Sequence, residues 1–244
     1  MIYQKFAKFY DELFDETMYD KWLSYVKDNV TKDESIMDMA CGTGRLLSFL
    51  SDEGYQVSGM DLSDDMLTLA DERLRDKENK VELIQGDMTD LSDLPNFNVI
   101  TCFDDSLCYL SDLETLQTTF ENVLNHLSDN GTFLFDVITP YQTDVVYPGY
   151  MYNYHDDENA FQWQSYIGEF DHSVEHDLVF FTYNEDIDAY DQFSETHFER
   201  TYELQTYLDL LKKVGFSSIE VSANFGHDEI SEDTTRWFFK CKKG

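Results

Sequence analysis

A glycine-rich segment followed by a single acidic residue carries the pattern best suited to binding a small molecule. Residues 38–44 read DMACGTG and lie between a short apolar stretch and a helical pattern. Glycines let the backbone approach a ligand closely, and the start of a helix offers free N–H groups. Roughly 20 residues later, Asp61 ends the next apolar stretch, where a carboxylate can hold both hydroxyls of a ribose. Together the two features predict a site for a cofactor that contains adenosine.

The spacing inside this turn differs from the fingerprint of dinucleotide cofactors. Leu47 stands three places after Gly44, where that fingerprint has a small residue that lets the helix pack closely. NAD and FAD are therefore disfavoured as ligands. A nicotinamide-dependent oxidoreductase nevertheless stays an alternative, and a non-catalytic protein that binds the cofactor is another.

The segment resembles motif I of the class I S-adenosylmethionine-dependent methyltransferases, the Rossmann-like type that acts on small molecules. Residues 61–67 look like the second motif of this family, and residues 86–88 look like its segment beside the adenine. Ala40 stands where the family often has a glycine. The resemblance covers the whole parallel-sheet portion, with three motifs in order. It implies S-adenosyl-L-methionine as cofactor and methylation of a small molecule, with nitrogen, oxygen and carbon all open as acceptor atoms.

Carried over position by position, the resemblance assigns roles around the cofactor. The backbone of the glycine turn would line the methionyl part, and Asp61 would bind the ribose. Leu62 and Met66 would flank the adenine, while Asp87 accepts from its amino group and the Met88 N–H reads a ring nitrogen. The expected cofactor-binding residues are Tyr10, Asp38, Ala40, Cys41, Gly42, Gly44, Asp61, Leu62, Met66, Asp87, Met88 and Phe103.

Methyl transfer from a sulfonium needs alignment of a nucleophile and, for some acceptors, removal of a proton. The segment 103–107 follows the fourth expected strand and would lie near the sulfonium and the substrate entrance. The candidates for proton acceptance or substrate binding are Asp104, Tyr109, His197 and Arg200. His197 and Arg200 also fit ordinary polar positions on a strand. Tyr10, the candidate for the cofactor carboxylate, also fits the buried stripe of an amphipathic helix.

Strand and helix patterns alternate along most of the chain, which predicts an α/β fold. We expect a doubly wound, mostly parallel seven-stranded Rossmann-like sheet with an antiparallel β insertion. The expected parallel strands are 35–40, 56–61, 81–86, 97–103 and 132–137. The expected helices are 45–50, 63–74, 112–127 and 204–214, the second capped by Ser63 and the last ended by Gly215. Residues 218–223 and 235–240 would close the sheet as an antiparallel pair.

Four regions follow from these patterns. Residues 1–32 would form N-terminal lid helices, and residues 33–139 would form the cofactor-binding core. Residues 140–202 lack a helical period and would form the antiparallel insertion, with strands over 163–170, 178–184 and 196–202. Residues 203–244 would supply the C-terminal helix and the closing strands. The aromatic insertion would serve as a substrate cap or as the contact of a homodimer.

The charge balance disfavours nucleic-acid substrates, because 50 acidic residues against 17 basic ones give a formal net charge of -33. The four cysteines show no zinc-ligand spacing, so we expect no metal and no disulfide. The first residues lack a signal-peptide pattern, and no apolar run is long enough to cross a membrane. These observations predict a cytoplasmic protein that works away from membranes.

Overall fold

A seven-stranded sheet forms the centre of the protein in the computed structural model, which describes residues 16–77 and 80–244. Its strand order is β10-β11-β5-β4-β1-β2-β3. The strands are β1 (Ser35–Met39), β2 (Gln56–Asp61), β3 (Glu82–Gln85), β4 (Phe97–Cys102), β5 (Leu127–Ile138), β10 (Ser218–Ser222) and β11 (Arg236–Lys242). Neighbours among β1 to β5 are parallel, while β11 runs antiparallel to both β5 and β10. The predicted sheet is therefore confirmed, including its closing antiparallel pair.

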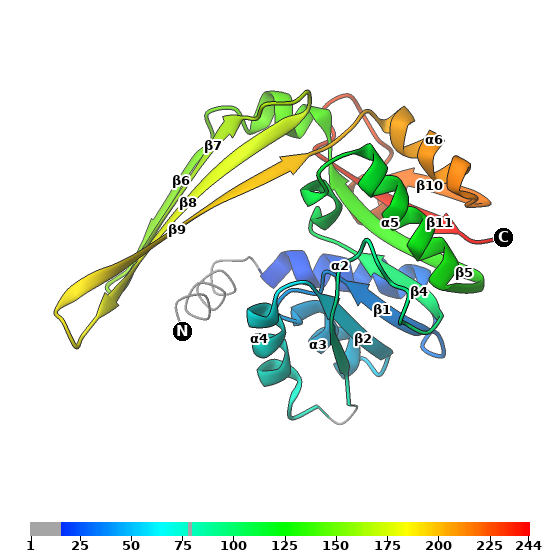
Figure 1. Ribbon diagram of the computed structural model, residues 1–244, viewed down its shortest axis with the longest axis horizontal. Coiled ribbons are helices and arrows are strands. Elements are labelled where there is room, and N and C mark those ends of the chain that lie inside the picture. Colours follow the sequence, from blue (N-terminus) through cyan, green and yellow to red (C-terminus); the bar gives the residue numbers. More distant parts are fainter. Residues whose placement is uncertain (1–15, 78–79) are drawn as a thin grey trace.

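Helices cover both faces of this sheet, as the alternating pattern predicted (Figure 1). Buried side chains of α2 (Glu16–Asn29), α3 (Arg45–Asp52) and α4 (Asp64–Leu74) form one hydrophobic cluster with the sheet. Those of α5 (Leu113–His126) and α6 (Leu204–Val214) belong to a second cluster. The near-continuous hydrophobicity of β4 and β5 follows from burial on both faces.

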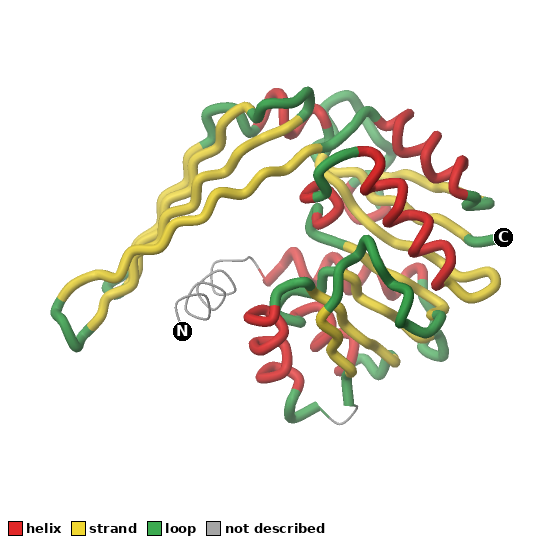
Figure 2. The backbone as a smooth tube through the Cα atoms, in the orientation of Figure 1, coloured by secondary structure: helices red, strands yellow, loops and turns green. Residues whose placement is uncertain are grey.

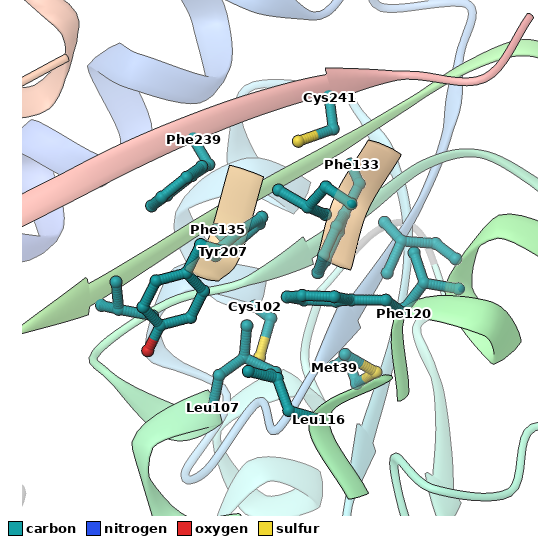
Figure 3. Packing of buried hydrophobic residues seen from close by; sticks show 14 of the residues in the cluster. Met39, Cys102, Leu107, Leu116, Phe120, Phe133, Phe135, Tyr207, Phe239 and Cys241 are labelled. Atoms are coloured by element: carbon teal, nitrogen blue, oxygen red, sulfur yellow. The ribbon is translucent and has the colours of Figure 1, made fainter. Parts of the chain in front are cut away.

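Stacked aromatic rings pack between β5 and its antiparallel neighbour β11 (Figure 3). The Phe135 ring lies 4.7 Å from that of Phe133 and 4.5 Å from that of Phe239 on β11, measured between centroids. Phe120 of α5 and Tyr207 of α6 pack against the same rings, at 5.7 Å from Phe135 and 5.6 Å from Phe239. Removing one such ring typically costs about 3–5 kcal/mol of stability.

The helix ends agree with the expected capping residues. The Ser63 hydroxyl accepts from the Met66 N–H at 3.3 Å, and Gly215 ends α6 with a φ of 123°. The helix expected over residues 112–127 is shorter by one residue at each end. Asp112 is its N-cap, accepting from the Thr115 N–H at 2.8 Å, and Leu127 already begins β5. The helix expected before residue 16, with Tyr10, falls outside the described residues.

Residues 151–200 form a separate four-stranded antiparallel sheet that projects from the body, and we call it the arm (Figures 1 and 2). Its strand order is β6-β7-β8-β9. The strands are β6 (Met151–His155), β7 (Asn159–Ile167), β8 (Ser173–Asn184) and β9 (Ala189–Arg200). The arm confirms an antiparallel insertion.

The expected strands of the arm were wrong in number and in length. Strand β6 was missed because all its residues are exposed, which removes the alternation that reveals a strand. Strand β7 ends at Ile167 rather than Phe170, because the chain turns there and the Phe170 N–H donates to the Ser173 hydroxyl at 3.0 Å. Strands β8 and β9 are longer than expected, and the acidic residues along the first half of β9 lower its strand propensity.

Candidate functional site

The turn after β1 adopts a backbone conformation that needs small residues. Ala40, Gly42 and Gly44 have φ angles of 61°, 54° and 71°. A Cβ on Gly44 would lie 2.9 Å from the Cβ of Ala70, so glycine lets α3 pack against α4. A Cβ on Gly42 would meet no atom of the described chain within 4 Å, which leaves open space beside the turn. Ala40 holds a left-handed conformation without a glycine's freedom, at a cost of about 1–3 kcal/mol.

Asp61, at the end of β2, faces this turn. One carboxylate oxygen accepts from the Gly42 N–H at 2.8 Å, and the other accepts from the Ser63 N–H at 2.9 Å. Burial raises the pKa of Asp61, while these backbone hydrogen bonds oppose the rise. A carboxylate has about four acceptor positions, so two remain for further donors. The group therefore fits a pair of ribose hydroxyls beside the open space at Gly42.

Asp38 lies beneath the turn rather than in the open space. It is buried, and it accepts from the Thr101 hydroxyl of β4 at 2.6 Å. Burial raises its pKa to about 7, and the nearby Asp61 charge adds to the rise. Cys41 is also buried, and a Cβ on Gly59 would lie 2.9 Å from its sulfur. These two positions fix the turn against its neighbouring strands.

The residues expected around the adenine lie beside β2 and β3. Leu62 is 69% exposed, which is unusual for a leucine, and Met66 is half-buried in the first turn of α4. Asp87 is exposed and accepts from the Thr89 N–H at 2.9 Å. Met88 is half-buried and packs against the core. Asp87 therefore stabilises a local turn as well as facing solvent.

The loop after β4 contains two consecutive aspartates in left-handed conformation, Asp104 and Asp105, with φ angles of 56° and 51°. It begins at Phe103, which is buried 6.4 Å from the ring of Trp22. The Asp104 side chain stays one-third exposed and lies 4.0 Å from the guanidinium of Arg236. Burial and the neighbouring Asp105 raise the pKa of Asp104.

Arg236 of β11 ties this loop to the sheet. Its guanidinium donates to Asp136 at 2.6 Å and to Asp105 at 2.7 Å. Asp136 is 0% exposed, and it also accepts from the Asp105 N–H at 2.9 Å and from the Trp22 indole at 2.7 Å. The sequence analysis missed this network. Its one available signal was a charged residue inside the apolar run of β5, since such residues are buried only when paired.

Two candidates that lie 88 residues apart meet at the base of the arm. The hydroxyl of Tyr109, on the short helix η1 (Ser106–Tyr109), lies 3.1 Å from Nδ1 of His197 on β9. Nε2 of His197 lies 2.9 Å from a carboxylate oxygen of Glu195. Because an ionised carboxylate only accepts, Nε2 carries the proton and Nδ1 accepts from Tyr109. Tyr109 is 47% exposed, so its hydroxyl can contact a ligand.

Arg200 does not join this group. It stacks on the rings of Phe170 and Tyr202, at 4.8 Å and 5.0 Å from their centroids. Successive residues of a strand point to opposite faces, so Arg200 lies on the other face of β9 from His197. The structure therefore brings Tyr109 and His197 together, places Asp104 on the loop just before η1, and separates Arg200 from them.

Comparisons with known proteins identify the family. A sequence profile described as a methyltransferase domain matches residues 36–131. A protein of Geobacillus sp. (strain WCH70) that carries a provisional methyltransferase name is 35% identical over 100% of both chains. A solved S-adenosylmethionine-dependent methyltransferase from Clostridium acetobutylicum is 30% identical over 100% of both chains, with a TM-score of 0.85. The chain belongs to the S-adenosylmethionine-dependent methyltransferases. Its methyl donor is S-adenosylmethionine, and the nicotinamide alternative is set aside.

A more distant relative matches less than half of this methyltransferase. An N,N-dimethyltransferase of Streptomyces fradiae, named for a dTDP-linked amino sugar, is 33% identical over 111 residues. This match covers 46% of the present chain and 42% of that protein.

The described part of the methyltransferase shows neither a metal site nor a membrane-spanning helix. Within residues 16–77 and 80–244, no group of three or more His, Cys, Asp or Glu side chains is placed to hold a metal ion. Across the same part of the chain, no helix has both the length and the apolar character needed to span a membrane.

Proposed function

We propose that this methyltransferase transfers the methyl group to a nitrogen atom of a small amine in the cytoplasm. The observation that carries the proposal is the Tyr109–His197–Glu195 chain beside the loop after β4, because it offers a route for the proton that an amine must release. The charges support an amine as well. The carboxylates of Asp104, Asp105 and Asp136 lie within 4.0 Å of the single guanidinium of Arg236. Glu199 adds a further acidic group near it, and this excess favours a cation on approach.

The cofactor residues expected from the sequence complete the proposal. Asp61 would bind the ribose hydroxyls, and the turn at Gly42 would approach the methionyl part. Leu62 and Met66 would flank the adenine, and the segment 87–88 would read its polar edge. This arrangement is supported by the open space at Gly42 and by the two acceptor positions left on Asp61.

The chemistry divides between the cofactor and the protein. Bound S-adenosylmethionine would supply a methyl group already activated by its sulfonium, for a nitrogen lone pair to accept with release of the thioether. The Tyr109 hydroxyl accepts the proton that the nitrogen then loses, while its own proton passes to Nδ1 of His197. Glu195 stabilises the resulting imidazolium through Nε2. Asp104 would position the amine, and Arg236 holds the loop that carries Asp104.

The arm has a proposed role of its own, as a cap over the acceptor and as the contact of a homodimer. Large apolar side chains are exposed along it, namely Met151, Tyr152, Ile167, Phe170, Ile187, Tyr190 and Phe198. Strand β6 also forms one edge of the arm sheet, where another strand can pair. Light scattering after size exclusion should give twice the chain mass, and Ile167→Lys together with Phe198→Lys should halve it. A monomeric parent protein would refute the dimer.

The proposed function is tested by binding and then by turnover. S-adenosylhomocysteine should raise the melting temperature, because a ligand that binds only the folded state stabilises it. Asp61→Asn should remove this shift, while Asp64→Asn, an exposed carboxylate on the next helix, should keep it. A panel of small amines, alcohols and phenols is then assayed for release of S-adenosylhomocysteine. Turnover confined to alcohols or phenols contradicts the amine, and binding without any turnover supports a non-catalytic role.

A further inference from the structure

Two buried polar side chains at the base of the arm have hydrogen-bonding atoms that the mechanism above does not use. His176 of β8 is 3% exposed and Glu199 of β9 is 7% exposed. Nε2 of His176 lies 3.7 Å from the nearer oxygen of Glu199, which is beyond hydrogen-bonding distance. In the described part of the chain, neither this nitrogen nor the second Glu199 oxygen has a hydrogen-bond partner. Buried polar groups without partners are rare in folded proteins and call for an explanation.

The neighbours of His176 determine which of its nitrogens carries the proton. The Trp163 indole N–H points to Nδ1 at 3.1 Å, and the Ser165 hydroxyl lies 2.8 Å from the same atom. An indole only donates, so Nδ1 must accept. Burial lowers the pKa of His176 to about 4, which keeps the ring neutral. Nε2 therefore presents an N–H donor toward Glu199.

Glu199 shares its hydrogen-bond donor, the Tyr109 hydroxyl, with another residue. The Tyr109 hydroxyl hydrogen-bonds to Glu199 and is also 3.1 Å from Nδ1 of His197, yet it has one proton to donate. Glu199 and His197 therefore compete for it. Burial and the nearby Asp105 raise the pKa of Glu199. Whether it is charged or protonated, one of its oxygens can still accept a hydrogen bond.

We propose that Glu199 and His176 form a subsite that binds a hydroxyl group of the methyl acceptor, an inference that rests on the proposed amine-methylating function. A hydroxyl accepts from the His176 Nε2–H and donates to Glu199, so it satisfies both groups at once. An ammonium has no lone pair and would leave the His176 N–H without a partner. The structure therefore favours an amino alcohol over a plain amine.

Tyr109 lies between the solvent and this subsite, and the acceptor's hydroxyl has to displace it from Glu199. Its hydroxyl holds Glu199 in this structure, and its half-exposed ring lies on a single turn of helix. The acceptor's hydroxyl takes the place of Tyr109 on Glu199, and the Tyr109 hydroxyl then donates to Nδ1 of His197 alone. Binding of the acceptor's hydroxyl therefore also aligns the Tyr109–His197–Glu195 chain for proton transfer.

The test compares two probes that differ by one hydroxyl, trans-2-aminocyclohexanol and cyclohexylamine. Each is titrated by calorimetry into the complex of the full-length protein with S-adenosylhomocysteine. The wild-type complex should bind the amino alcohol at least tenfold more tightly, since a site built for a hydroxyl rejects the analogue that lacks it. In Glu199→Met this ratio should fall to about one. Glu175→Gln, one residue from His176 on the opposite face of β8, should keep the wild-type ratio.

The outcomes separate the inference from the function on which it rests. Failure of the S-adenosylhomocysteine complex to form contradicts the cofactor assignment, whereas a formed complex that binds both probes equally, or neither, overturns the hydroxyl subsite. A purely structural role predicts that Glu199→Met weakens both probes alike, with an unchanged ratio. Retention of both the ratio and the wild-type affinities in a folded Glu199→Met variant would show that a bridging water alone accounts for the pair.

Discussion

Removing the guanidinium of Arg236 should destabilise the protein strongly. The group lies 2.6 Å from Asp136 and 2.7 Å from Asp105, and Asp136 is 0% exposed. Arg236→Met keeps much of the side-chain volume but leaves these carboxylates without their cation. Breaking a buried ion pair in this way typically costs about 3–5 kcal/mol. For a chain of this size, that loss corresponds to a fall of about 6–20 °C in melting temperature.

The loss should depend on pH with a definite sign. Burial raises the pKa of Asp104 and of Asp105 even with Arg236 present, and loss of the cation raises both further. A carboxyl group with a raised folded-state pKa favours the folded state at low pH, and this contribution is lost as pH rises through that pKa. The difference between variant and wild type should therefore be small near pH 4 and grow toward pH 8.

Urea unfolding of both proteins at several pH values measures this difference, with an unchanged m-value as the check that unfolding is comparable. Arg75→Met is the matched control, because Arg75 pairs with Asp71 at 3.3 Å on the surface and both side chains are largely exposed. Its loss should change stability little at any pH. A cost below about 1 kcal/mol for Arg236→Met near pH 8, or a cost that does not vary with pH, would refute the reasoning.

Three further changes test other parts of the structure. Tyr109→Phe should lower kcat about 100-fold and leave S-adenosylhomocysteine affinity intact, because only proton transfer is removed; an unchanged kcat on an identified amine would speak against the Tyr109–His197–Glu195 chain. Gly44→Ala should destabilise by about 1–3 kcal/mol in urea unfolding, because a Cβ there meets that of Ala70. Phe135→Ala should cost about 3–5 kcal/mol by the same measurement, and a smaller loss would mean that the rings around it collapse into the space.

The parallel sheet and its cofactor turn were predictable because their signals are local. The turn over residues 38–44 and Asp61 are separated by one helix, and the order of alternating elements determines which strand ends meet. The capping residues Ser63 and Gly215 were equally readable, since a cap depends on positions within one turn. Local patterns therefore predict most of the fold.

The acceptor side of the site could not be predicted, because it depends on contacts between distant segments. Asp136 and Arg236 are 100 residues apart and meet only because β11 inserts beside β5. Neither His176 nor Glu199 was a candidate, because their burial depends on where the arm joins the body. Tyr109 and His197 were proposed separately as candidates, yet nothing in the sequence placed them 3.1 Å apart.

The position of β11 also has a consequence for the order in which the molecule is made. This strand lies between β5 and β10, so the sheet stays incomplete until residues 236–242 have left the ribosome. Until then Asp105 and Asp136 lack the guanidinium of Arg236, and the loop after β4 lacks the hydrogen bonds that hold it against the sheet. A nascent chain can therefore form its cofactor turn early, but the loop after β4 is fixed in place only once Arg236 has joined the sheet.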